Sequence, residues 1–341
     1  MSGPGIPAHP PGAVKNPWRR GGGCRRGAAP RTAGFPSSPP GTGRTGTALG
    51  LHRPLRSWRE SVGRQPSRKG ERMTRPAPVE ALTAWDRQAV GEADWLLPLP
   101  PACSRAPADL AAQVTRRLRN GRGFVVIRGF PVDGRSDQEC AAMGRQLAAS
   151  LGAVRPADPG DLITVSDAAG LGKTDLALGL HTDRTPAPHP PRLLGLLCVR
   201  QAAQGGETLL ASGHTVHNSL LAESPWALPR LYQDFHFGRG TGFDRLRPVF
   251  QRHGADLRVH YNRRGIERAQ HEAGATLTPG EQAALDAVDR ILSDPRTVLR
   301  VPLRPGDFLW VDNTVVLHGR TAFTDPPDPY ARRCLARVWV D

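Results

Sequence analysis

The 341-residue chain has few cysteines, and none of them forms a pattern typical of a zinc site or a disulfide framework. The five cysteines stand singly at positions 24, 103, 140, 198 and 334, without a Cys-x-x-Cys pair, whereas such sites depend on short, regular spacings. Cys140, Cys198 and Cys334 fall in stretches predicted to be helix or strand, where a free cysteine packs as a small apolar residue. This usage fits a reducing compartment, and we expect a cytoplasmic protein.

Long hydrophobic runs are absent as well. No stretch of about eighteen apolar residues occurs, so we expect no membrane span and no membrane partner. Zinc proteases carry the motif His-Glu-x-x-His, but here His271–Glu272 is followed by Ala273, Gly274 and Ala275, which excludes that motif.

Acidic residues are scarce in the first part of the chain. Residues 1–72 contain 14 Lys or Arg and only two Glu, together with 11 Pro and 14 Gly, so they carry most of the net charge of +15. A segment of this composition cannot bury enough apolar surface to offset the entropy of ordering. We predict that residues 1–75 are disordered and that residues 76–341 form the folded domain.

Three explanations compete for this basic segment. Arginine clusters such as Arg19–Arg20 are suited to nucleic acid or another polyanion. A targeting segment would need an apolar stretch after the charges, which is missing. The third explanation, which we favour, places the true start at Met73, where the composition becomes ordinary. On that interpretation nucleic acid is not an expected partner.

Caps and periodicity predict helices and strands in the rest of the chain. Ser136 with Glu139, and Thr278 with Glu281, have the spacing of capping boxes that begin helices. The predicted helices span 108–119, 136–151 and 278–292, and the predicted strands span 124–128, 193–200, 207–211, 298–303, 307–312 and 334–340. This pattern is compatible with a double-stranded β-helix, or jelly roll, flanked by helices, although composition alone does not select that fold.

The most informative pattern is His181–Thr182–Asp183, followed far downstream by His318. On a strand, residues i and i+2 point to the same face, so His181 and Asp183 are predicted to face one cavity, to which a paired strand can bring His318. Two histidines and one carboxylate hold a non-haem Fe(II) with coordination positions left open, and a zinc hydrolase site accepts the same set. Asp312 and Asn313 are candidates for holding the imidazoles in place.

Four stretches resemble the TauD/TfdA family of Fe(II)/2-oxoglutarate dioxygenases. They are GRGFVVIRGFPVD (121–133), LHTDRTPAPHPPRLLGLLCVRQAAQGGETLLASG (180–213), GDFLWVDNTVVLHGRTAF (306–323) and RRCLARVWV (332–340), in the family's order. The motif HGRTAF (318–323) is especially similar to that of the clavaminate-synthase-like branch. The resemblance implies a jelly-roll core, Fe(II) bound by His181, Asp183 and His318, and 2-oxoglutarate and O2 as co-substrates. The aspartate at position 183 argues against a halogenase.

The resemblance also implies anchors for the distal carboxylate of 2-oxoglutarate. The family places an arginine on a late strand, where Arg332 and Arg333 both qualify, and Thr208 matches a position whose hydroxyl assists. We prefer Arg333, because on a strand it shares a face with Arg337 and Trp339, while the small and branched residues between them face the other way. The alternative interpretation is a basic edge strand that faces solvent.

The implied reaction is hydroxylation of an unactivated C–H bond in a small molecule, an amino acid or an amino-acid-derived secondary metabolite. A cationic or zwitterionic substrate would suit Asp175, whereas an acidic substrate would suit Arg337 or Arg263. Two alternatives stay open: an oxygenase of a sulfonate or another small acid, and a catalytically inactive metal-binding jelly roll with a polyanion-binding tail. A homo-oligomer is also an open alternative.

Overall fold

The computed structural model describes residues 76–99, 107–156, 161–165, 174–238 and 245–341. Contacts divide the chain into two units, Met1–Arg75 and Pro76–Asp341, and every described residue belongs to the second. The predicted disorder of residues 1–75 and the predicted start at Met73 therefore lie outside the described residues. No helix in the described part of the chain is both long and apolar enough to cross a bilayer.

The larger sheet has seven strands, and its central strands are the most buried. Its order is β1 (Leu96–Pro98), β2 (Phe124–Arg128), β14 (Phe308–Asp312), β6 (Leu193–Arg200), β17 (Cys334–Val340) and β3 (Val154–Arg155), with β4 (Leu162–Ile163) also paired to β17. Hydrogen-bonded neighbours flank β17 on both sides. The interpretation of this segment as a basic edge strand is therefore wrong.

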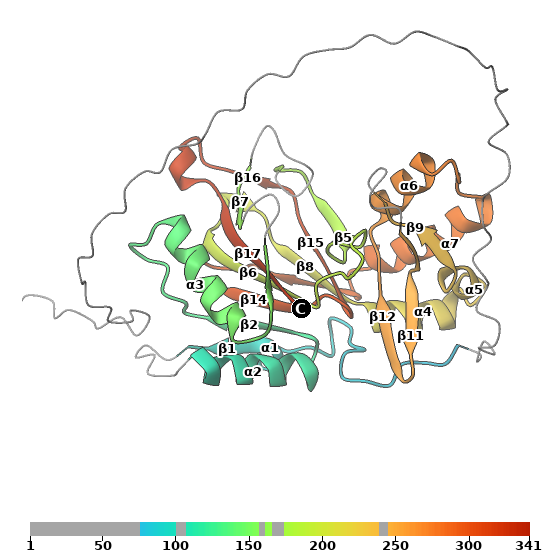
Figure 1. The fold of residues 1–341 in the computed structure, drawn as a ribbon, viewed down its shortest axis with the longest axis horizontal. Helices are drawn as coiled ribbons and strands as arrows, with labels where there is room; N and C mark the ends of the chain where they lie inside the picture. The colour runs from blue at the N-terminus through green and yellow to red at the C-terminus, as the bar shows by residue number, and fades with distance from the viewer. Residues whose placement is uncertain (1–75, 100–106, 157–160, 166–173, 239–244) are drawn as a thin grey trace, which may run out of the picture. The chain divides into compact units, whose positions relative to one another are not determined.

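Two helices cover the outer face of the larger sheet (Figure 1). The helices α2 (Pro107–Arg119) and α3 (Asp137–Ala149) pack against the small and branched residues of β17 in one apolar cluster. Leu335 and Trp339 of the same strand belong to a different cluster on the opposite face, which confirms the predicted alternation. The predicted capping box is present, because the Ser136 side chain accepts a hydrogen bond from the Glu139 amide at the start of α3.

The smaller sheet has four strands in the order β13 (Val298–Val301), β8 (Thr208–Ser212), β15 (Val316–Arg320) and β5 (Leu178–His181). Its inward side chains, such as Leu210 and Val316, share one cluster with Phe124, Leu335 and Trp339 of the larger sheet. Two sheets packed face to face in this way form a jelly-roll core, as predicted. Within the described residues the sheets do not close into a barrel.

A long insertion between β8 and β13 covers the outer face of the smaller sheet, where Ala211 and Leu317 join its apolar cluster (Figure 1). The insertion contains α4 (Gly213–Glu223), α5 (Leu228–Leu231), β9 (Asp234–His236), β10 (Leu246–Pro248), β11 (Phe250–His253), β12 (Asp256–Val259), α6 (Arg263–Glu272) and α7 (Pro279–Ser293). Of these elements the sequence predicted only α7, whose capping box is formed by Thr278 and Glu281. The other short elements are α1 (Glu92–Trp95), η2 (Pro329–Ala331), and β7 (Gln204–Gly205) paired with β16 (Phe323–Thr324).

Candidate active site

The two histidines of the predicted metal site lie opposite each other on neighbouring strands. His181 is the last residue of β5, and the strand register pairs it directly with His318 of β15. Their ring centroids are 4.5 Å apart. Asp183 does not lie on the strand as predicted, because β5 ends at His181 and the chain turns. Arg184 in this turn has a left-handed φ of 55°, the one positive φ among the described non-glycine residues.

The turn nevertheless brings the carboxylate to the histidines. The candidate ligand atoms of His181, Asp183 and His318 all lie within 4.8 Å of one another. Both Nε2 atoms approach the same Asp183 Oδ1, at 3.2 Å from His181 and 3.5 Å from His318. The Nδ1 of His181 lies 2.9 Å from the Gly179 carbonyl, and donation of that N–H leaves Nε2 as the ligand atom. This donor set fits a divalent transition metal.

The charges of the three groups also suit a metal. Burial alone would raise the pKa of Asp183, but the charges of and hydrogen bonds from the two histidines hold that pKa well below its ordinary value. Burial lowers the pKa of His318, and the nearby His181 lowers it further. Asp183 is therefore ionised and His318 neutral near pH 7, the protonation states in which these side chains bind metals. His181 differs, because burial is outweighed by the hydrogen bond and charge of Asp183, which raise its pKa, so this imidazole must give up a proton when a metal binds.

Two residues hold Asp183 in place. The indole Nε1 of Trp339 donates a hydrogen bond to Asp183 Oδ2 at 2.8 Å. Asn313 accepts from the Asp183 amide at 2.6 Å and donates to its carbonyl at 3.1 Å. Asn313 thus supports the turn that carries the Asp183 carboxylate, whereas we had predicted that it holds an imidazole. The Asp312 carboxylate accepts hydrogen bonds from the hydroxyl and amide of Thr314, and among the described residues no hydrogen bond joins it to either histidine. The role of Trp339 was missed, although its position on the Arg333 face of β17 was a signal.

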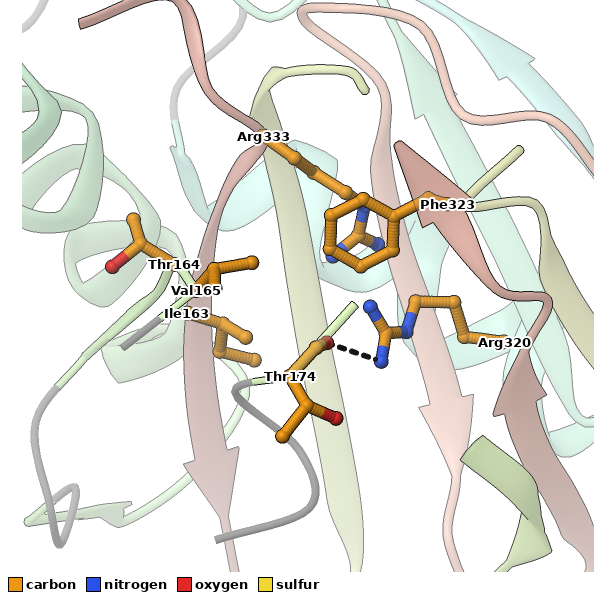
Figure 2. Close-up of a pocket in the computed structure, with 7 residues that line it drawn as sticks. All are labelled: Ile163, Thr164, Val165, Thr174, Arg320, Phe323 and Arg333. Carbon is orange, nitrogen blue, oxygen red and sulfur yellow. Dashed lines mark hydrogen bonds between the residues drawn. The ribbon is translucent and has the colours of Figure 1, made fainter. Parts of the chain in front are cut away.

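A second feature is a small, tightly lined cavity with two buried guanidinium groups. Figure 2 shows Arg320 and Arg333 reaching the same space beside the Phe323 ring. Their guanidinium carbons lie 4.4 Å and 5.2 Å from the ring centroid. The remaining lining residues are Ile163, Thr164, Val165 and Thr174. Thr208 is buried and pairs with Arg320 in the strand register.

Two buried arginines give this cavity its positive charge, which the carboxylates of Asp175 and Asp325 offset in part. Arg320 is 6 % exposed and Arg333 is 4 % exposed. Burial, and next the charge of Arg333, lower the pKa of Arg320 to about 10. The Arg333 Nε is buried without a hydrogen-bond partner among the described residues, while its main-chain amide donates to Asp325. A buried cation with unused donors suits an anionic ligand such as a carboxylate.

A third feature joins the metal site to two further arginines. The Arg337 guanidinium lies 4.1 Å from the centroid of the Trp339 ring, and that of Arg184 lies 5.2 Å from it. The Arg337 Nε is buried without a partner in the described part of the chain. Burial lowers the pKa of Arg337; the charge of Asp183 opposes this shift, and the charge of Arg184 adds to it. Because Trp339 also binds Asp183, the guanidinium groups of Arg184 and Arg337 adjoin the candidate metal site.

Three other predicted residues take different places. Arg263 begins α6 and forms ion pairs with three carboxylates, at 2.7 Å from Glu267 and Asp286 and 2.6 Å from Asp289. Its guanidinium is thereby engaged within the insertion. Arg332 does not line the cavity, and its carbonyl accepts from Arg200.

Asp175 is exposed, and its carbonyl accepts a hydrogen bond from the Phe323 amide. Its neighbours Thr174 and Leu176 contact Arg320, so Asp175 lies beside the two-arginine cavity rather than at the three candidate metal ligands. Arg320 itself was not among the predicted site residues.

Comparison with known proteins adds family evidence. Residues 98–339 match the family model described as taurine catabolism dioxygenase TauD, TfdA family. FR-33289 synthase from Streptomyces rubellomurinus (strain ATCC 31215) is 30 % identical over 278 residues, which cover 77 % of this chain and 78 % of that protein. A uridine-5′-phosphate dioxygenase from a Streptomyces species is 36 % identical over 152 residues, covering 42 % of this chain and 53 % of that enzyme.

Solved structures share the fold. Asparagine oxygenase in complex with Fe(II), 2S,3S-3-hydroxyasparagine and succinate superposes with a TM-score of 0.57 at 22 % identity, covering 69 % of this chain and 79 % of that one. The non-heme iron oxygenase OrfP in complex with Fe and alpha-ketoglutaric acid gives a TM-score of 0.52 at 18 % identity, covering 72 % and 93 %. At these identities the likeness establishes the architecture.

Proposed function

Because the chain belongs to the taurine catabolism dioxygenase TauD, TfdA family, we propose that it uses Fe(II), 2-oxoglutarate and O2 to hydroxylate an unactivated C–H bond of a small molecule. The observation that carries this proposal is the convergence of His181, Asp183 and His318, whose candidate ligand atoms lie within 4.8 Å of one another. In this proposal the three side chains hold Fe(II), and Trp339 and Asn313 hold the aspartate.

The buried cavity is the proposed site of the 2-oxoglutarate distal carboxylate. Arg333 supplies a planar pair of N–H donors that matches a carboxylate, and its unpartnered Nε supports this role. Arg332 is set aside because its side chain does not line the cavity. Thr208 is the proposed hydroxyl donor, on the grounds of its burial and its pairing with Arg320.

Fe(II) held by His181, Asp183 and His318 would supply O2 activation coupled to the oxidative decarboxylation of 2-oxoglutarate to succinate and CO2, with one oxygen atom going to succinate and the other into the substrate C–H bond. The protein contributes orientation and charge. Arg333 fixes the far end of the co-substrate, and the apolar cluster between the sheets limits access of water to the site.

Arg337 and Arg184 are the proposed anchors for an anionic group of the substrate. Both guanidinium groups lie against Trp339, and the structural neighbours include complexes with the amino acids 3-hydroxyasparagine and (3S)-hydroxy-L-Arg. An amino acid or amino-acid derivative, held by its carboxylate, is therefore our first candidate. The second candidate is a small acid without an amine. Among the described residues, Trp339 binds the carboxylate of Asp183, which is a proposed metal ligand and so is not available to pair with a substrate amine. The relative that acts on uridine-5′-phosphate also has an anionic substrate.

The free, buried cysteines Cys140, Cys198 and Cys334 support a cytoplasmic location for this enzyme. Association into a homo-oligomer remains part of the proposal to be measured by light scattering.

The test is a substrate screen by succinate release with the full chain, Fe(II) and 2-oxoglutarate. Free L-amino acids form one arm, and sulfonates, carboxylates and phosphate esters form the other. We expect substrate-dependent succinate with the wild type and none with His181→Ala or Asp183→Ala. His189→Ala changes an exposed histidine of the same segment and is expected to retain turnover. Full turnover in either ligand variant would falsify the site assignment.

A further inference from the structure

We infer that Arg320 is a positioning residue that couples occupancy of the co-substrate carboxylate site to the placement of β5, the strand that ends in His181. This inference rests on the proposed function, because it assigns the two-arginine cavity to the carboxylate of 2-oxoglutarate. It gives a role to a residue that lies within the HGRTAF stretch but belongs neither to the predicted site residues nor to the proposed ligand set.

Arg320 holds the chain just before β5. Its Nη2 donates to the carbonyl oxygens of Thr174 and Leu176 at 2.8 Å and 2.7 Å, and Figure 2 shows the first of these bonds. Its backbone lies on β15 and pairs with Leu178, the first residue of β5. The strand β5 is four residues long. It is therefore fixed at one end by Arg320 and at the other by the pairing of His181 with His318.

The same guanidinium faces the proposed carboxylate site. Arg320 and Arg333 both contact Phe323 and both line the cavity. Two buried like charges repel each other. The carboxylates of Asp175 and Asp325 offset part of this repulsion, and an anion bound between the two guanidinium groups would offset more of it. The described hydrogen bonds of Arg320 use only Nη2, whereas a guanidinium has five N–H donors. A carboxylate in the cavity can therefore bind the other donors while Nη2 keeps its two carbonyl partners.

These contacts link two sites through one rigid element. Filling the cavity with an anion is expected to hold Arg320 in the geometry that binds Thr174 and Leu176, and so to steady β5 and His181. Because such coupling is reciprocal, an ordered β5 also favours co-substrate binding. A residue with a purely local structural role would not respond to the anion.

The test separates this coupling from metal chelation by using metal-free full-length protein and glutarate, a dicarboxylate without a keto acid group. Hydrogen exchange of the amides in residues 176–181 is measured with and without glutarate. In the wild type we expect glutarate to slow exchange about tenfold. Arg320→Gln is expected to bind glutarate about tenfold more weakly, as for loss of one charged hydrogen bond, and to show no slowing even at saturating glutarate.

Two further variants complete the design. Arg320→Lys keeps the charge but lacks the fork that reaches two carbonyls, so we expect glutarate affinity within about threefold of the wild type and loss of the slowing. Arg300→Gln changes a largely exposed arginine on β13 of the same sheet and should behave as the wild type. If Arg320→Gln and Arg320→Lys both retain the glutarate-dependent slowing, the inference is overturned.

Failure of the proposed function has a different signature. Under that outcome the wild type would not bind glutarate or 2-oxoglutarate, and Arg333→Gln would change nothing. A third outcome is that Arg333→Gln loses glutarate binding while both Arg320 variants retain the glutarate-dependent slowing of hydrogen exchange. That outcome overturns only the coupling.

Discussion

Replacement of Trp339 by Phe is the sharpest perturbation of the proposed metal site that leaves every proposed ligand in place. Trp339 is 3 % exposed, and its Nε1 donates to Asp183 Oδ2 at 2.8 Å. Phenylalanine keeps an aromatic ring in the cluster between the sheets but removes this N–H. Asp183 then loses the partner that fixes one of its two oxygens.

The expected size of the effect follows from the charge of the acceptor. A hydrogen bond to a charged group contributes about 1.5–3 kcal/mol, and 1.4 kcal/mol corresponds to about a tenfold change in affinity. Loss of an outer partner of a metal ligand weakens metal binding by about 10- to 100-fold. Both routes predict that Trp339→Phe lowers the affinity for Fe(II) by about 10- to 100-fold.

The chain contains a matched control in the same sheet. Trp310 on β14 is fully buried, and its Nε1 has no hydrogen-bond partner among the described residues. Trp310→Phe therefore removes the same atoms from the protein without breaking a bond to Asp183. Anaerobic titration of Fe(II), followed by calorimetry, compares the two variants with the wild type. Equal Fe(II) affinity in the two variants, with both folded by circular dichroism, would refute the assigned role of Trp339.

Three further predictions concern other parts of the molecule. Arg333→Gln should raise the KM for 2-oxoglutarate by about 10- to 100-fold, because a charged hydrogen bond is lost. Arg332→Gln should leave that KM unchanged. Equal effects of the two variants in steady-state kinetics would reject Arg333 as the anchor. Arg263→Gln should lower the free energy of unfolding in urea by about 1–2 kcal/mol without raising any KM, since the three ion pairs of Arg263 lie within the insertion. A raised substrate KM would instead support the predicted role of Arg263 in substrate binding. Burial lowers the pKa of His260 to about 3 from 6.5, so below pH 6.5 the unfolded chain binds the extra proton. Stability should thus fall as the pH drops from 6.5 towards 3, by up to about 1.4 kcal/mol per pH unit from this group. Urea unfolding at pH 7.5 and pH 5 measures this loss of stability, which should be smaller in His260→Gln than in the wild type. An identical loss in the two proteins would contradict the contribution assigned to His260.

The sequence predicted those parts of the fold that depend on local signals. The capping boxes at Ser136 and Thr278 begin helices in the structure, because the hydrogen bonds of a cap are made within four residues. The alternation along β17 correctly separated the core face from the face that carries Arg337 and Trp339. Most of the insertion escaped prediction, since its short strands such as β9 and β10 are stabilised by tertiary packing rather than by a strong local pattern.

The candidate site was predicted in its composition but not in its geometry. Asp183 was expected on a strand, yet it follows β5 in a turn where Arg184, rather than a glycine, adopts positive φ. Asp183 and Pro186 are residue types typical of turns, and this signal was overlooked. The bond from Trp339 to Asp183 joins residues 156 apart in the chain. Arg320 was overlooked although the alternation from His318 along β15 places both on one face.

The most direct measurement of the central claim is the visible absorption of the protein with Fe(II) and 2-oxoglutarate under anaerobic conditions. The account predicts a weak charge-transfer band in the wild type that disappears in His318→Ala, with both proteins folded by circular dichroism. An undiminished band in His318→Ala, or a wild type that binds Fe(II) and 2-oxoglutarate without any band, would contradict the assignment of the metal and its co-substrate to this site.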